Sequence, residues 1–224
     1  MAYSKRDAIR IVSSAAKEYQ KKLEGTNLLF IYRDRKTNQI EFFEAIFLAN
    51  NFQHLSGIEM IDSDGNRVQS ATLFYQKCLD GKLKEEEIRF KDDGTTELKL
   101  NALPYVVSFI DKSKITGLFN GKGLTLEIDR LVGTVTYCLG FIQDGEYFYP
   151  GSCLLSDVRN LVDVPSQVLA IFSKSVEEKE PLYKNIRYLA KGFPIEKVNF
   201  PEKLRDKITI ENKMAYDQDD NKNG

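Results

Sequence analysis

The chain has 224 residues, enough to bury a substantial core, and its 42% hydrophobic and 29% charged residues are typical of a folded globular protein. A net charge of -1 excludes the global basic character of a strong, non-specific nucleic-acid binder, although it leaves room for a local basic cleft. No run of about 18 apolar residues occurs, and the first residues are polar. We therefore expect a cytoplasmic protein without a membrane span or a signal peptide.

The cysteines and the single histidine argue against a metal centre. Cys78, Cys138 and Cys153 stand far apart in apolar surroundings, which is typical of buried thiols. No Cys-x-x-Cys pair occurs, and one histidine cannot complete the usual zinc ligand sets. The glycine-rich segment 117–123 departs from the spacing of a phosphate-binding loop. We expect neither a metal nor a cofactor.

Helical periodicity is clearest at the N-terminus. Ser4 and Asp7 have the spacing of a capping box, and the apolar residues that follow predict a helix ending near Gly25. Ser70 is expected to cap a second helix over 71–79, which Gly81 ends. A third helix is predicted over 100–110, after an exposed turn or loop over 91–96.

Strand patterns flank these helices. Residues 28–32 and 40–48 are rich in aromatic and β-branched side chains and predict an antiparallel hairpin. Further strands are predicted over 124–128, 133–142, 146–149 and 167–175, with a hairpin turn at Gly145. The connection 150–165 fits a short helix or a packed loop, and 183–190 fits a strand or a helix.

These elements predict an α+β fold, in which N-terminal and central helices pack against an antiparallel sheet. We expect one domain over residues 1–210. The polar segment 211–224 is nearly devoid of apolar residues and is expected to be a disordered tail.

His54, the only histidine, follows the second predicted strand. Because the imidazole titrates near neutral pH, His54 is the first candidate for acid-base catalysis. The ordinary alternative is a histidine that caps a turn or lies half-buried against a backbone partner. The residue type alone leaves both interpretations open.

Polar groups at later strand ends are candidates for contact with a nucleic acid. Tyr149 and Ser152 lie where aromatic rings can stack on bases and hydroxyls can donate to phosphate, although a core strand followed by a Pro-Gly turn is the simpler explanation. Lys174 closes the strand over 167–175, where a solvated edge lysine is common. If 183–190 is helical, Lys184 and Arg187 share one face with Lys191 and can hold phosphates, although such a stripe is more often only solvated.

Three segments of the chain, taken in order, resemble the phage barnase-EndoU-colicin-RelE-like nuclease family. They are FQHLSGI at 52–58, VG with CLGF within 132–141, and YPGSCLLSDVR at 149–159. A lysine-bearing strand ending at Lys174 and a following tyrosine, Tyr183, also fit the family's order. The resemblance covers most of residues 4–192. It implies a barnase/EndoU/RelE-like α+β fold and a metal-independent ribonuclease activity, often in prophage or mobile-element proteins.

The resemblance also implies roles for the candidate residues in cleaving RNA by 2′-hydroxyl transesterification. His54 is expected to act as base or acid, Lys174 to neutralise the phosphate, and Ser152 and Tyr149 to donate hydrogen bonds. The acid-base partner must be a lysine, a tyrosine or a carboxylate, because no second histidine exists. The residues expected to bind RNA are Lys112, Lys184 and Arg187.

Two other functions compete with this hypothesis. Near-neutral charge and acidic patches favour a nonenzymatic interaction protein that keeps a nuclease-like fold and binds or inhibits a host or phage macromolecule. Its protein partner would be an antitoxin or a host nucleic-acid enzyme. A small-molecule enzyme comes last, because the sequence contains no cofactor motif.

Overall fold

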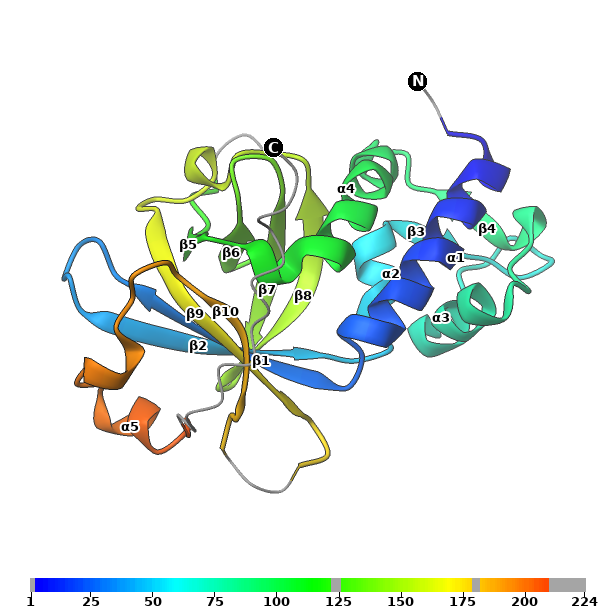
Figure 1. Ribbon diagram of the computed structural model, residues 1–224. Helices are drawn as coiled ribbons and strands as arrows, with labels where there is room; N and C mark the ends of the chain where they lie inside the picture. The colour runs from blue at the N-terminus through cyan, green and yellow to red at the C-terminus, as the bar shows by residue number, and fades with distance from the viewer. Residues whose placement is uncertain (1–2, 122–125, 179–181, 210–224) are drawn as a thin grey trace, which may run out of the picture.

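The computed structural model describes residues 3–121, 126–178 and 182–209 (Figure 1). The helices in these ranges are α1 (Lys5–Lys22), α2 (Asn51–Ser56), α3 (Ala71–Asp80), α4 (Thr95–Phe109) and α5 (Glu202–Arg205), with 3-10 helices η1 (Glu85–Glu87), η2 (Ile110–Lys112), η3 (Val158–Asn160) and η4 (Ile195–Lys197). The strands are β1 (Thr26–Arg33), β2 (Ile40–Phe47), β3 (Ile58–Met60), β4 (Ile88–Phe90), β5 (Ile115–Leu118), β6 (Arg130–Gly133), β7 (Cys138–Asp144), β8 (Tyr147–Leu154), β9 (Ser166–Ser175) and β10 (Asn185–Leu189).

The main sheet closes on itself. Its strands follow the order β1-β2-β8-β7-β6-β5-β9, and β9 pairs back onto β1, while β10 extends the sheet from β9 outside this ring. The predicted α+β class is therefore confirmed, but the expected wholly antiparallel sheet is only partly correct. The β2–β8 pair is parallel, and closure into a barrel removes the exposed strand edges that an open sheet would leave.

Strand β1 is buried on both faces. Phe30 stacks on Phe43 of β2 at a ring-centroid distance of 4.8 Å, and it also lies 6.1 Å from the ring of Phe141. Because β2 and β8 separate β1 from β7 in the ring, the Phe30–Phe141 contact crosses the barrel interior. Leu29 and Ile31 point outward into a second apolar cluster, which residues of β9 and of the C-terminal segment complete.

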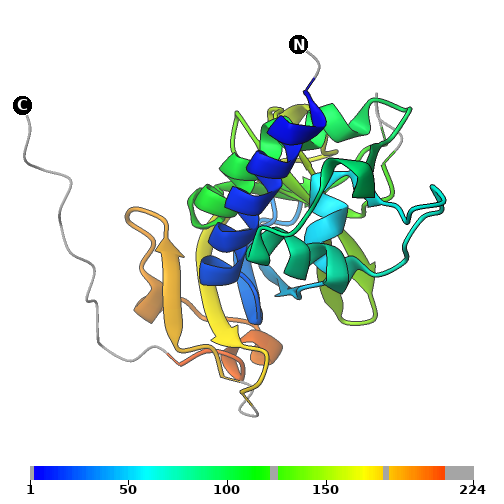
Figure 2. The same ribbon diagram turned by 90° about the vertical axis from the view of Figure 1, so that its right-hand side faces the viewer.

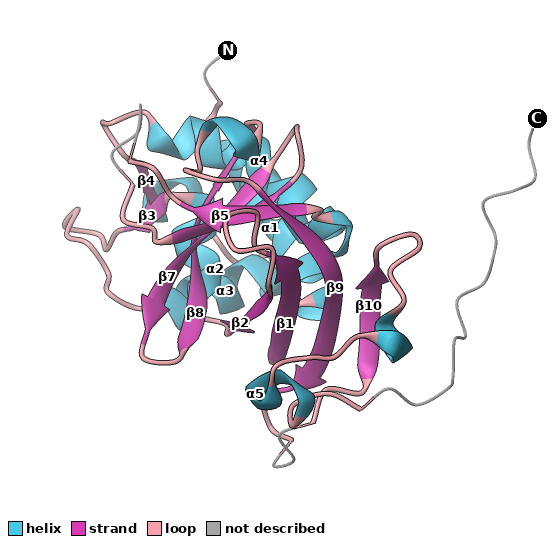
Figure 3. Ribbon diagram, turned by 90° about the vertical axis from the view of Figure 1, so that its left-hand side faces the viewer, coloured by secondary structure: helices cyan, strands magenta, loops and turns pink. Residues whose placement is uncertain are grey.

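Helices α1 to α4 gather at one end of the barrel (Figures 1 and 2). Ser4 caps α1, since its Oγ accepts the backbone N–H of Asp7 at 3.1 Å, as its capping position predicts. Buried Tyr19 of α1 meets Phe52 of α2 at 5.4 Å and Tyr75 of α3 at 5.8 Å between ring centroids. The opposite side of β1 and β9 carries β10 and α5 (Figure 3).

Several predicted elements are confirmed with small shifts. These are α1, the β1–β2 hairpin, α3 with Ser70 as N-cap, the β7–β8 turn at Gly145, and β9. The segment 183–190 forms the strand β10 rather than a helix, and 150–165 completes β8 and then packs through η3. No helix of the described residues is long and apolar enough to cross a membrane.

Other boundaries differ for local reasons. Helix α4 begins at Thr95, inside the predicted loop, with Gly94 as its N-cap. Just ahead of the helix, Asp93 Oδ1 accepts the Thr95 N–H at 2.9 Å and closes the turn that leads into it. The strand predicted over 133–142 is two strands, β6 and β7, joined by a tight turn after Gly133. Residues 126–128 are not a strand, and residues 122–125 and the predicted tail over 211–224 lie outside the described residues.

We predict that Gly133→Ala destabilises the fold by about 1–3 kcal/mol, the usual cost of overpacking. A methyl group at this position would overlap the Tyr137 carbonyl oxygen and lie 2.7 Å from the Cys138 Cα, so the β6–β7 turn must open. Urea unfolding measures the loss. Thr136→Ala changes an exposed side chain of the same turn and is expected to alter stability by less than about 0.5 kcal/mol; equal midpoints for the two variants would contradict the prediction.

Candidate functional site

The FQHLSGI block forms the short helix α2 and the turn that ends it. Asn51 Oδ1 accepts the Leu48 N–H at 2.8 Å as the chain leaves β2. Gly57 ends the helix with φ +68°, and a Cβ there would lie 3.1 Å from the Thr96 Cα, so glycine is required. Of the seven residues in the block, His54 is the exposed one. The others anchor the helix and leave the imidazole at the surface.

A buried lysine fastens α2 to α4 and β8. Lys99 of α4 is 8% exposed, and its Nζ donates to the carbonyl oxygens of His54 at 2.7 Å and Gly151 at 3.3 Å. Thr96, one turn earlier, donates to the Gly57 carbonyl at 2.7 Å, and the Cys153 thiol donates to the Leu55 carbonyl at 3.3 Å. The backbone of His54 is therefore held beside the segment of β8 that contains Tyr149 and Ser152.

The surroundings of His54 favour its neutral form. Partial burial lowers the pKa of the imidazole below 6.5, and the positive charges of Lys99, Lys91 and Arg67 lower it further. Lys91 and Arg67 are exposed. A neutral imidazole can accept a proton near pH 7, and the same cations would attract an anion such as a phosphate.

Ser152 and Tyr149 are less accessible than the sequence suggested. Cys153 packs toward the barrel interior, so the adjacent Ser152 points to the opposite, outer face of β8, where Leu154 joins another buried cluster. Ser152 Oγ is buried and has no hydrogen-bond partner among the residues that the structure describes. Tyr149 is half-buried. Ser152 therefore does not present its hydroxyl to solvent beside His54.

Lys174 belongs to a separate cluster on the outer face of the barrel. Its Nζ lies 4.9 Å from the ring centroid of Tyr183, so the lysine and the tyrosine that the resemblance picked out are in contact. The Tyr183 hydroxyl donates to Glu44 Oε2 at 2.5 Å, and Lys207 Nζ donates to Glu44 Oε1 at 2.6 Å. Burial and the Glu44 carboxylate raise the pKa of Tyr183. Tyr183 is fully buried, and Glu44 is 6% exposed.

The predicted RNA-binding residues do not form a helical stripe, because β10 is a strand. Arg187 donates to Asp111 Oδ2 at 2.7 Å and to the Lys22 carbonyl at 3.3 Å, and thus ties β10 to η2 and α1. Lys112 and Lys184 are exposed. Their role in RNA binding stays a prediction.

The chain matches a known family model over residues 11–192, and the family is described as phage-Barnase-EndoU-ColicinE5/D-RelE like nuclease4. The chain belongs to this family. The resemblance seen in the sequence is thereby confirmed, and the matched region is a nuclease-like domain that includes α2, Lys99, Lys174 and Tyr183. No curated protein and no solved structure matches the chain. The family match ends before residues 193–209, which supply Lys207.

Two parts of this nuclease-like domain escaped the sequence interpretation. Lys99 carries a detectable signal, because it repeats at helical spacing with buried Leu103 and Val106 and so falls on the apolar side of α4. Glu44 gives a weaker signal as a carboxylate within a strongly apolar strand. Its contact with Tyr183 spans 139 positions and cannot be inferred from local pattern.

We predict that His54 titrates with a midpoint below 6.5, because burial and three cations disfavour its protonation. Imidazole NMR signals measure this without ambiguity, since His54 is the only histidine. Lys91→Gln removes one of the cations and is expected to raise the titration midpoint of His54. Lys184→Gln, at the position directly before β10, is the control and should leave this midpoint unchanged. A midpoint at or above 6.5 in the folded protein would refute the assignment. Because the pKa of His54 is lower in the folded than in the unfolded chain, the free energy of unfolding decreases as the pH falls below about 6.5.

We also predict that Lys207→Met destabilises the protein by about 1–3 kcal/mol, because it leaves the buried Glu44 carboxylate without its cation. Adding Glu44→Gln removes the uncompensated charge and is expected to recover part of the loss. Urea unfolding of the single and double variants gives the coupling. Lys203→Met, at an exposed position of α5, is the matched control. If Lys207→Met and Lys203→Met unfold at the same urea concentration, the contact between Lys207 and Glu44 does not stabilise the C-terminal segment.

Proposed function

We propose that this protein is a metal-independent endoribonuclease that cleaves RNA through attack of the 2′-hydroxyl on the adjacent phosphate, giving a 2′,3′-cyclic phosphate. The carrying observation is the exposed His54, whose pKa is lowered beside Lys91 and Arg67. Membership of a nuclease-like family supports the reaction class. The family description names phage nucleases, and we extend the proposal to a phage or mobile-element context and to action on RNA in the cytoplasm.

The geometry suits His54 to the role of general base. A neutral imidazole takes the 2′-hydroxyl proton as the 2′-oxygen bonds to phosphorus. The charge that develops on the phosphate oxygens is stabilised by the side chains of Lys91 and Arg67. The bond from phosphorus to the 5′-oxygen then breaks, and this oxygen needs a proton. We assign the acid to the exposed ammonium of Lys91. After the cyclic phosphate leaves, water takes the proton from His54 and reprotonates Lys91.

The other predicted residues divide according to their environment. Tyr149 stays in the proposed site as a half-buried residue of β8, two positions before Gly151, whose carbonyl oxygen accepts from Lys99. Ser152 is left out because its hydroxyl is buried, and Lys174 because its amine packs on Tyr183 in the outer cluster. Lys112 and Lys184 are exposed cations that can contact the RNA chain at a distance from the cleavage point.

Independence from metal is part of the proposal. The imidazole and the neighbouring cations can supply the base and the charge stabilisation that the reaction needs.

The test is incubation of the full chain with a mixed RNA pool in EDTA. Wild type is expected to release 2′,3′-cyclic phosphate ends and to spare DNA of the same sequence, which lacks the attacking hydroxyl. His54→Ala is expected to lose about 100-fold or more in rate, the usual contribution of a general base. The wild-type rate should rise with pH through the midpoint that NMR gives for His54.

Folding of His54→Ala is checked by urea unfolding, and its midpoint should stay near that of wild type because the imidazole is exposed. Equal cleavage by wild type and His54→Ala would refute the mechanism. Absence of cleavage by wild type would refute the activity and favour the alternative, a nonenzymatic protein that binds a host or phage macromolecule.

A further inference from the structure

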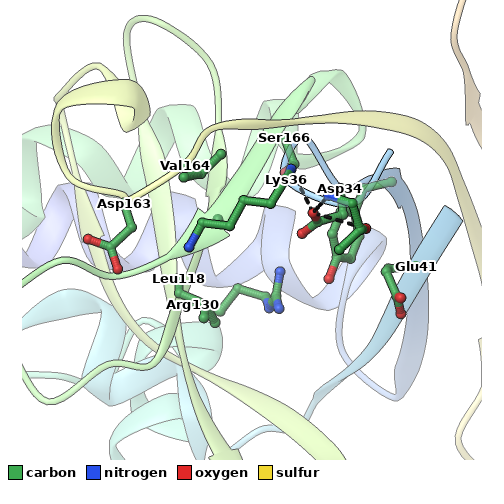
Figure 4. Close-up of a pocket in the computed structure, with 11 residues that line it drawn as sticks. Asp34, Lys36, Glu41, Leu118, Arg130, Asp163, Val164 and Ser166 are labelled. Carbon is green, nitrogen blue, oxygen red and sulfur yellow. Dashed lines mark hydrogen bonds between the residues drawn. The ribbon is translucent and has the colours of Figure 1, made fainter. Parts of the chain in front are cut away.

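The barrel has an open mouth at the end away from α2. Strand β1 starts at Thr26, near the helices, and runs to Arg33 at the mouth, a length of about 25 Å at the usual rise per residue. A cavity of about 240 Å³ lies in the mouth (Figure 4). Its walls come from the β1–β2 turn, from β5 and β6, and from the segment before β9. The cavity is therefore separate from His54.

Arg130 of β6 forms the inner wall of this cavity. Its guanidinium carbon lies 5.0 Å from the ring centroid of Tyr32, 4.9 Å from that of Phe43 and 5.7 Å from that of Phe148. These contacts satisfy the face of the guanidinium, and Tyr32 also makes a side-chain hydrogen bond with it. Nε is buried and has no hydrogen-bond partner within the described part of the chain. A group that brings acceptor atoms into the cavity would complete it.

The rim of the cavity carries mainly negative charge, opposite to that of Arg130. The side chains of Asp34, Glu41 and Asp163 line the cavity together with the ammonium group of Lys36. In Figure 4 the Arg130 guanidinium extends to the side where Asp34 and Glu41 lie, and Lys36 extends toward Asp163. Three carboxylates disfavour a phosphate or another multiply charged anion here. The cavity suits a neutral ligand that offers acceptors at one edge and N–H donors at the next.

We propose that the mouth of the barrel binds a guanine base. Its O6 and N7 are two adjacent acceptors that match the fork of an arginine, the commonest arrangement for reading this base. Its N1–H and exocyclic amine are donors suited to a carboxylate. Glu41 is assigned as their acceptor, since Asp34 Oδ1 already accepts the backbone N–H groups of Lys36 at 2.8 Å and Thr37 at 2.9 Å.

The pairing predicts selectivity. Adenine presents a donor where guanine has O6, and so opposes the guanidinium with an N–H group. Uracil lacks an exocyclic amine for Glu41. Each good bidentate contact is worth about 1–3 kcal/mol, and 1.4 kcal/mol corresponds to a factor of ten, so guanosine is expected to bind about 5- to 150-fold more tightly than adenosine.

The experiment is an NMR titration of the full chain with guanosine, adenosine, cytidine and uridine, with backbone amide shifts as the readout. Guanosine is expected to shift amides at the mouth, such as those of Leu118 and Ser166, and to leave His54 unchanged. Glu41→Gln alters an exposed side chain and is expected to weaken guanosine about tenfold without affecting folding. Glu146→Gln, an exposed carboxylate in the β7–β8 hairpin, is the matched control.

Arg130→Lys keeps the charge but loses the fork, and is expected to abolish the preference for guanosine over adenosine. Equal binding of the four nucleosides, shifts confined to other surfaces, or no shifts at all would overturn the proposal. Because the readout is binding at a cavity distant from His54, these outcomes do not depend on whether the protein cleaves RNA.

Discussion

The pairing of β1 with β9 is the constraint on which the rest of the structure depends. The two strands pair from Thr26–Ser175 to Arg33–Gln167 and close a seven-stranded ring within the described residues. Closure gives the sheet an inside and an outside. The inner side chains of β1 fill the barrel and the C-terminal segment covers the outer ones, which explains the unbroken apolar run in that strand. An open sheet would also leave an exposed strand edge.

Closure also separates the charged groups into three environments. His54 lies at the helix-capped end, Arg130 at the open mouth, and Lys174 on the outer wall under the C-terminal segment. Around His54, cations surround a surface imidazole. At the mouth, the Arg130 guanidinium lies on aromatic rings. On the outer wall, Glu44 and Tyr183 share a buried hydrogen bond. A near-neutral chain thus contains strongly different local fields.

The sequence predicts what is decided locally. Caps at Ser4 and Ser70, the turn at Gly145 and the apolar strand ending at Lys174 all follow from nearby residues, and the ordered set of motifs indicates the family. The parallel β2–β8 pair and the β1–β9 closure join segments more than 100 residues apart, so their register depends on packing that no local pattern encodes. For the same reason the sequence placed Lys174 with His54, whereas the barrel wall puts it with Tyr183.

Lys99 shows how closely structure and chemistry are linked at the proposed site. Burying an ammonium group is costly, and here two carbonyl oxygens, from α2 and β8, offset part of that cost. An apolar side chain of similar length would pack there with less desolvation, but it would not hold the His54 carbonyl. The charge is also poorly screened at this depth, so it acts strongly on the imidazole and helps to keep it neutral. A single buried lysine thus positions the backbone of His54 and, after burial itself, contributes most to lowering the pKa of the imidazole. A variant that removes the amine alters both properties together.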